Sequence, residues 1–298
     1  NYKRTNTRSS IFYYGLVECG IVVGALVVPT CFSYAEELLK ASSEVGSFLY
    51  LTKSSILIGV TLLPWCFFMG CTYPLMAGYL KEIDPIKVSG FSFLYLGNVI
   101  GATLGVLATG FVFIELWGFK GTLILGGGLN LLVGVLALLI ASLGAKRIIR
   151  KSVVKSSAVQ LAGMCFSTRM SLIILFSTGF ISMAMEVIWI RAFTPILGTT
   201  IYAFAAVLAV YLLATFLGTL AYRSSLRMKF KFNVDLIVIF LAIATILPLI
   251  VSDPELSNAR WVPLISIMPF CFLLGILTPG LVDGFSGGAA DRIGIAYF

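Results

Sequence analysis

Histidine is absent from this sequence of 298 residues, and the absence removes several classes of chemistry at once. A chain without histidine cannot build a His-based catalytic triad or a His-ligated haem, and it lacks a common zinc ligand. No Walker sequence, nucleophile elbow or HExxH motif is present either. The six cysteines include no CxxC pair, so we interpret them as small buried hydrophobic residues. The sequence therefore indicates no catalytic residue, no metal site and no cofactor.

Charged residues are scarce as well. They make up 11% of the chain, against about 25% in a soluble domain, while 59% of the residues are hydrophobic. Apolar runs of about 20 residues recur, and each is long enough to cross a bilayer as a helix. The net charge of +8 does not indicate nucleic-acid binding, because the basic residues lie in short loops between these runs. The composition predicts an all-α polytopic membrane protein whose first partner is the lipid bilayer.

The apolar runs predict about eight complete transmembrane spans and the start of a ninth. With the first residues in the cytoplasm, sixteen of the 21 Lys and Arg residues fall on the inner side and five on the outer side. This bias predicts a cytoplasmic N-terminus, in what we interpret as a prokaryotic cytoplasmic membrane. The spans are predicted near residues 12–34, 54–80, 91–115 and 121–143, two within 179–223 that are joined by a turn at 195–199, then 234–251 and 261–282, with the ninth beginning near 292.

A short internal repeat links the second and eighth predicted spans. Residues 64–74 read PWCFFMGCTYP and residues 269–279 read PFCFLLGILTP, with five identical positions in eleven. Pro29 in the first span also matches Pro248 in the seventh. A period of six spans keeps both copies in the same orientation, as in the two halves of major-facilitator transporters. The repeat therefore predicts a major-facilitator-like architecture of parallel six-helix repeats.

This architecture predicts two halves and the linker between them. The first helical half covers residues 1–143 and the second covers residues 171–298, and a basic cytoplasmic linker joins them at 144–170. A complete pair of six-span repeats has twelve spans. We therefore expect a longer protein, with two further spans before the first residue and the rest of the last spans after the final one.

Two carboxylates lie inside apolar spans, Glu18 in the first and Glu186 in the fifth. A charge at membrane depth costs several kcal/mol unless it is paired, hydrated or protonated. Each carboxylate is therefore either a structural hydrogen-bonding group or a site for a substrate or a proton. Arg191 follows Glu186 by five residues, which places the two side chains about 140° apart on a helix, so we do not expect them to pair. We predict instead that Arg191 and Trp189 anchor the outer membrane interface.

Glycines and prolines recur within the spans. GxxxG spacing lets helices approach closely in lipid, and it predicts packing within the bundle, with dimerisation or a moving contact as alternatives. Proline inside a span kinks the helix, which gives either a fixed bend or a hinge. The predicted packing residues are Gly97, Gly101 and Gly105 in the third span and Gly20 and Gly24 in the first, and the predicted kinks are at Pro64, Pro74, Pro269 and Pro279.

Several short motifs resemble the membrane part of the spermidine synthase-like fused membrane proteins. They include Gly179-Phe180, Glu186-Val187, Trp189, Arg191, Leu197-Gly198, and a Leu217-Gly218 turn toward Arg223. The resemblance implies a major-facilitator-like bundle, in a family whose members often carry a Rossmann-type aminopropyltransferase domain. This sequence contains no such soluble domain and no residues that would bind its decarboxylated S-adenosylmethionine donor.

Three functions are compatible with these observations. The first is a transporter-like bundle that moves or senses a small cationic solute, with Glu186 and Glu18 as counter-charges. The second is a non-catalytic scaffold or accessory subunit of a larger membrane protein complex, docked to other subunits through its GxxxG faces. The third is the membrane anchor of an aminopropyltransferase-like enzyme, which requires a soluble partner domain. We expect no nucleic-acid partner.

Overall fold

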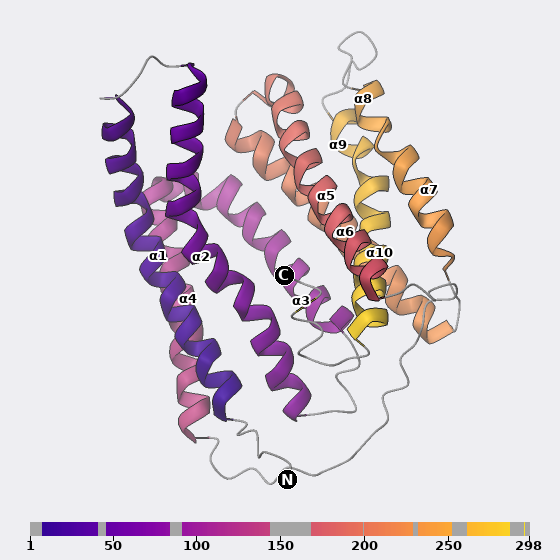
Figure 1. Cartoon of the computed structure of the whole chain (residues 1–298), viewed down its shortest axis with the longest axis horizontal. Helices are drawn as coiled ribbons and strands as arrows, with labels where there is room; N and C mark the ends of the chain where they lie inside the picture. Colours follow the sequence, from indigo (N-terminus) through magenta and orange to yellow (C-terminus); the bar gives the residue numbers. More distant parts are fainter. Residues whose placement is uncertain are drawn as a thin grey trace. The chain divides into compact units, whose positions relative to one another are not determined.

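The computed structural model describes residues 8–40, 46–83, 91–143, 168–198, 200–228, 232–251, 261–286 and 295. Over those ranges the chain is almost entirely helical and contains no strand (Figure 1). Seven helical segments within them are long and apolar enough to cross a membrane, as expected for an all-α integral membrane protein. Most of the predicted linker at 144–170 and of the predicted ninth span lies outside the described residues.

The chain divides into two compact units that do not follow chain order. The first contains residues 1–85 and 119–152, and the second contains residues 86–118 and 153–298. The third predicted span therefore belongs to the second unit, where it packs against the sixth, although the repeat assigns it to the first half. The six-span repeat, and the halves that it defines, stay predictions.

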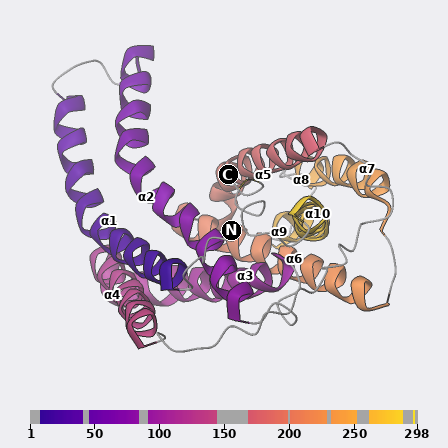
Figure 2. The same ribbon diagram turned by 60° about the horizontal axis from the view of Figure 1, so that its bottom comes forward.

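The first unit is built from α1 (Arg8–Lys40), α2 (Phe48–Ile83) and the later part of α4 (Ile114–Leu143). Helices α1 and α2 lie side by side (Figures 1 and 2). A Cβ built on Gly24 would lie 2.6 Å from the Trp65 ring, and one on Gly20 would lie 3.2 Å from the Phe68 ring. These two glycines therefore lie where α1 and α2 are in close contact.

The third and fourth predicted spans follow each other without a loop. Helix α3 (Phe91–Ala108) continues through a π-helical turn (Thr109–Phe113) into α4. A straight helix over residues 92–143 would be about 78 Å long, more than twice the thickness of the hydrocarbon core. The backbone leaves the helical conformation at Gly118, where φ is 64° and ψ is −178°. Glycine adopts this φ without steric cost, and the break falls between the two predicted spans.

Helix α10 (Met268–Ser286) forms the centre of the second unit. It contacts α5, α6 and α7, which surround it in Figure 2, where it is seen nearly end-on. The segment Val262–Phe285, which contains most of α10, is the most buried of the seven candidate spans. The other helices of this unit are α3, α5 (Thr168–Leu197), α6 (Thr200–Met228), α7 (Val234–Ala244), α8 (Leu247–Val251) and α9 (Val262–Ser266).

Helices α6 and α10 cross with their backbones in contact. A Cβ on Gly218 would lie 2.1 Å from the carbonyl oxygen of Phe272, and one on Gly275 would lie 2.2 Å from that of Thr215. Both positions therefore require glycine, because backbone atoms cannot move aside as a flexible side chain can. The resemblance implies a turn at Leu217-Gly218, whereas the structure places these residues inside α6, at this crossing.

A hydroxyl group on α6 completes the hydrogen bonding of α10. Pro279 has no N–H, so the carbonyl of Gly275 loses the partner that an α-helix would supply. The hydroxyl of Thr219 donates to that carbonyl oxygen at 3.0 Å, and the Thr219 side chain is fully buried. Neighbouring Ser and Thr side chains commonly satisfy such carbonyls in membrane helices. This contact favours a fixed bend over a hinge at Pro279.

Two further prolines coincide with breaks between helices of the second unit. Helix α7 ends at Ala244, four residues before Pro248, and α9 ends at Ser266, three residues before Pro269. Proline removes the hydrogen bond to the carbonyl four residues earlier and its ring clashes with that carbonyl. The helix interruptions therefore lie where the sequence removes a backbone donor.

Candidate functional site around Glu186

One face of α5 is directed into the second unit. Ser182, Glu186, Trp189 and Phe193 are spaced by four, three and four residues, which aligns them along one stripe of the helix. Ser182, Trp189 and Phe193 are buried, and Glu186 is half-buried among them. Because α5 packs against α6 and α10, Glu186 lies on the protein-facing side of α5.

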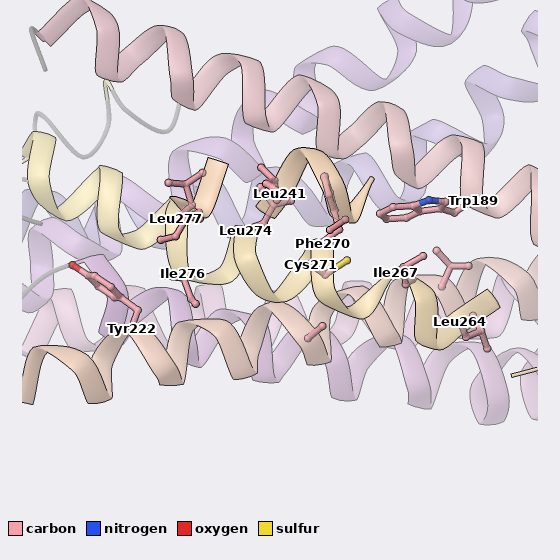
Figure 3. Packing of buried hydrophobic residues seen from close by; sticks show 14 of the residues in the cluster. Trp189, Tyr222, Leu241, Leu264, Ile267, Phe270, Cys271, Leu274, Ile276 and Leu277 are labelled. Atoms are coloured by element: carbon pink, nitrogen blue, oxygen red, sulfur yellow. The ribbon is translucent and has the colours of Figure 1, made fainter. Parts of the chain in front are cut away.

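Trp189 is packed in the core of the second unit. Its side chain is 1% exposed and meets the Phe270 ring edge to face, with the ring centroids 5.5 Å apart and the planes at 83° (Figure 3). An interface anchor keeps its indole N–H at the boundary with water. The predicted anchor role of Trp189 is corrected by this burial, while Arg191 is exposed on α5 and its anchor role stays a prediction.

The indole N–H of Trp189 has no hydrogen-bond acceptor among the described residues, and its nitrogen is buried. Leaving a buried donor unpaired costs about 1–3 kcal/mol, so such groups are rare and call for an explanation. Trp189 follows Glu186 by three residues, which makes the two side chains neighbours on the surface of α5. One stripe therefore carries an unpaired donor next to a carboxylate acceptor.

Within the described ranges, Glu186 has no hydrogen-bond or ion-pair partner; the ion pair found there joins Lys40 to Glu36 on α1. The absence of a pair with Arg191 agrees with the 140° separation expected from helix geometry. The Glu186 carboxylate lies within electrostatic range of the buried thiol of Cys271 on α10. The carboxylate thus faces other helices without being neutralised by a described cation.

Hydroxyl groups extend from this stripe onto α6. Ser182 and Tyr211 share a hydrogen bond of 3.0 Å between their hydroxyl oxygens. One turn further along α6, the Thr215 hydroxyl donates to the carbonyl of Tyr211 at 2.8 Å and lies 3.4 Å from that of Cys271. The surroundings of Glu186 therefore contain hydroxyl groups, a thiol and an indole, all of them neutral.

This arrangement suits a single positive charge. A carboxylate in an apolar, partly desolvated setting attracts a cation more strongly than one in water, and it also binds a proton readily. No group of three or more His, Cys, Asp or Glu residues that could hold a metal ion is found in the described ranges. The local chemistry therefore fits an organic cation or a proton.

Glu18 occupies a different environment, in the first unit. It is 7% exposed and accepts a hydrogen bond from Tyr14, one turn earlier on α1. A Cβ on Gly134 of α4 would lie 3.2 Å from the Cβ of Glu18, so a second helix covers the carboxylate stem. A partner on its own helix favours the structural interpretation of Glu18 over a solute site. Glu18 and Glu186 belong to different compact units.

The glycines of α3 differ from those of α1. Gly97, Gly101 and Gly105 are exposed, and a Cβ built on any of them would have no neighbour within 4 Å in the described part of the chain. Ser92 and Val99, on the opposite face of α3, are the buried ones. Within the second unit no described residue packs against this triplet, and its packing role stays a prediction, with dimerisation or a moving contact as alternatives.

The prolines of the first unit lie inside one continuous helix. Helix α2 runs through both Pro64 and Pro74, with Pro64 exposed and Pro74 half-buried. Pro269 lies in the first turn of α10 beside the break that follows α9, and Pro279 lies within α10. All four are helical, and whether Pro64 and Pro74 act as hinges stays a prediction.

Sequence reasoning missed a polar cluster near the C-terminal end of α6. Tyr222 donates to the carboxylate of Asp283 on α10 at 3.3 Å. Arg223 donates to the Ser92 hydroxyl on α3 at 3.4 Å, and its guanidinium carbon lies 5.3 Å from the centroid of the Phe93 ring. These contacts join α3, α6 and α10. Their partners are 61 and 131 residues apart, so no local spacing could have indicated them.

The observations define an integral membrane protein of helical class that carries an acidic candidate site inside one compact helical unit. Comparison of the chain with protein-family models, with curated proteins and with solved structures finds no match. The candidate site is therefore argued from its own residues.

Proposed function

We propose that this protein is a transporter-like membrane bundle that binds a small cationic solute at Glu186. The observation that carries the proposal is the position of this carboxylate, which is half-buried on the protein-facing stripe of α5 and unpaired within the described ranges. A carboxylate inside a transmembrane segment that faces the bundle is by default a candidate for a substrate or proton site. Pro279 and the breaks before Pro248 and Pro269 lie in the same unit.

Two further features support the proposal. The chain resembles the membrane part of the spermidine synthase-like fused proteins, a resemblance that implies a major-facilitator-like bundle. The excess of Lys and Arg on one side predicts a cytoplasmic N-terminus in a prokaryotic cytoplasmic membrane. In that orientation the first residues of α6 lie on the outer side and the cluster around Arg223 lies on the inner side. Glu186 would then lie between the outer side and the inner side of the membrane, where a solute could bind on its way across.

Binding of a simple amine to the purified full chain tests the proposal. We expect ethylamine to bind wild-type protein, and Glu186→Gln to weaken binding at least about tenfold, because the neutral amide cannot offset the ammonium charge. Isothermal titration in detergent or nanodiscs gives the dissociation constants. Glu37→Gln is the matched control, since Glu37 is exposed on α1 and its loss should leave binding unchanged.

The proposal fails if the wild type binds no amine, or if Glu186→Gln binds ethylamine as tightly as the wild type does. A fold check by circular dichroism accompanies each variant. Uptake of the amine into proteoliposomes, driven by a concentration gradient, then separates transport from binding without transport.

The exposed glycines of α3 favour a second candidate, a scaffold or accessory subunit. Gly97, Gly101 and Gly105 present open backbone that another transmembrane helix could approach closely. A Gly101→Cys variant should then cross-link to a partner in native membranes. A Val99→Cys variant should not, because Val99 is buried. Equal labelling of both by lipid-soluble reagents, without any cross-link, would argue against this candidate.

A further inference from the structure

The unpaired indole of Trp189 adds a second requirement to the ligand of Glu186. Its nitrogen is buried and lacks an acceptor in the described part of the chain, although its ring is well packed against Phe270. Packing therefore accounts for the burial of the Trp189 ring, but it does not account for a buried N–H without an acceptor. A phenylalanine would fill much of the same space without leaving a donor unsatisfied.

The position of this donor relative to Glu186 is set by the helix. Three residues separate them, which corresponds to a rise of about 4.5 Å and a rotation of about 60° on the same face. The two side chains therefore share one face of α5. The hydroxyl pair of Ser182 and Tyr211 lies one turn away on the other side of Glu186, and its two members already bond each other.

We propose that the solute carries an oxygen acceptor next to its amine, and that the N–H of Trp189 donates to that oxygen. The class is a small amino alcohol, as opposed to a simple alkylamine. This inference rests on the proposed function, because it takes the amine at Glu186 as given. It goes further in assigning specificity to Trp189, since a site with a buried donor discriminates against an analogue that leaves the donor unpaired.

Three probes that share one ammonium group separate the two requirements. Ethylamine carries no acceptor, ethanolamine carries a hydroxyl and glycine carries a carboxylate. We expect the wild type to bind ethanolamine roughly tenfold more tightly than ethylamine, the value of one hydrogen bond. Glycine should bind more weakly than ethanolamine, because its carboxylate is repelled by that of Glu186. Trp189→Phe should remove this preference, measured as the ratio of the dissociation constants for ethylamine and ethanolamine. Trp261→Phe is the control, because Trp261 is exposed.

Nuclear magnetic resonance gives a readout in which Trp189 itself is left unchanged. The chain has four tryptophans, so its indole N–H spectrum has four resonances, and the three other Trp→Phe variants assign that of Trp189 by elimination. Ethanolamine should shift this resonance downfield, and ethylamine should leave it nearly unchanged.

The outcomes distinguish this inference from the function on which it rests. If ethylamine binds in a Glu186-dependent way but the three probes bind equally, or Trp189→Phe keeps the preference, the inference is overturned and the cationic site stands. If no probe moves the Trp189 indole resonance, the inference is likewise overturned and the cationic site stands. A bound water would then be the acceptor of the N–H. If no amine binds the wild type, the proposed function fails and the inference falls with it.

Discussion

The two compact units satisfy their buried polar groups in different ways. In the first unit the buried carboxylate of Glu18 accepts from Tyr14 on the same helix. In the second unit the hydrogen bonds of Thr219, Tyr211 and Tyr222 cross from α6 to other helices. A partner four residues away is supplied by helix geometry alone, whereas a partner on another helix exists only after the helices have packed. These hydrogen bonds of the second unit therefore depend on its tertiary contacts, whereas that of Glu18 does not.

The aligned prolines show the same contrast. Pro29 lies inside the continuous helix α1, and its counterpart Pro248 lies just after the break between α7 and α8. Pro64 lies inside the continuous helix α2, and its counterpart Pro269 lies beside the break between α9 and α10. The same residue type is thus compatible with a continuous helix and with a broken one, so the surroundings decide whether a proline interrupts its helix.

The largest expected effect tests the backbone contact of the second unit. Gly275→Leu should destabilise the protein by about 3 kcal/mol or more, because its side chain would meet the Thr215 backbone, which cannot move aside. Gly101→Leu, on the open face of α3, should change stability little. Unfolding in a titration with a denaturing detergent measures both. Equal stabilities for the two variants would remove the contrast between packed and open glycines.

A smaller effect is expected from the Thr219 hydroxyl, which donates to the Gly275 carbonyl four residues before Pro279 of α10. Thr219→Val should cost about 1–2 kcal/mol, since the Gly275 carbonyl then has no donor. In a Pro279→Ala background the loss should shrink, because the restored N–H at position 279 can bond that carbonyl. A double-mutant cycle on unfolding free energies measures the coupling.

Thr103→Val is the control for that cycle. The Thr103 hydroxyl donates to the Val99 carbonyl within α3, so its removal breaks only a helix-local bond. A Thr219→Val cost that is the same with proline or alanine at position 279 would show that the hydroxyl has no special role at the kink.

The smallest effect is expected in the first unit. Tyr14→Phe should cost at most about 1 kcal/mol, because it removes one helix-local hydrogen bond to Glu18. The cost should vanish in a Glu18→Leu background, and Tyr13→Phe should have no effect because Tyr13 is exposed. Unfolding free energies of the four variants provide the comparison. A Tyr14→Phe cost larger than that of Thr219→Val would reverse the proposed order of the two units.

Helix packing around the candidate site could be anticipated only in part. The close contacts of Gly20 and Gly24 follow from their spacing on α1, and the lack of a pair between Glu186 and Arg191 follows from the helix angle. The burial of Trp189 did not follow, because its location beside Arg191 suggested a membrane boundary. The neighbours that bury it come from α10, about 80 residues further along the chain.

The sequence by itself determined that this is a helical membrane protein, since apolar runs of sufficient length and a scarcity of charge act locally along the chain. It also predicted which carboxylates lie inside the apolar helices. Only the tertiary structure decided which faces of the helices meet: that Glu186 faces α6 and α10, that Gly218 and Gly275 touch, and that α3 joins the second unit. The physical reason is that in lipid every apolar face is equally well solvated, so the choice of neighbour depends on fit and on distant polar partners.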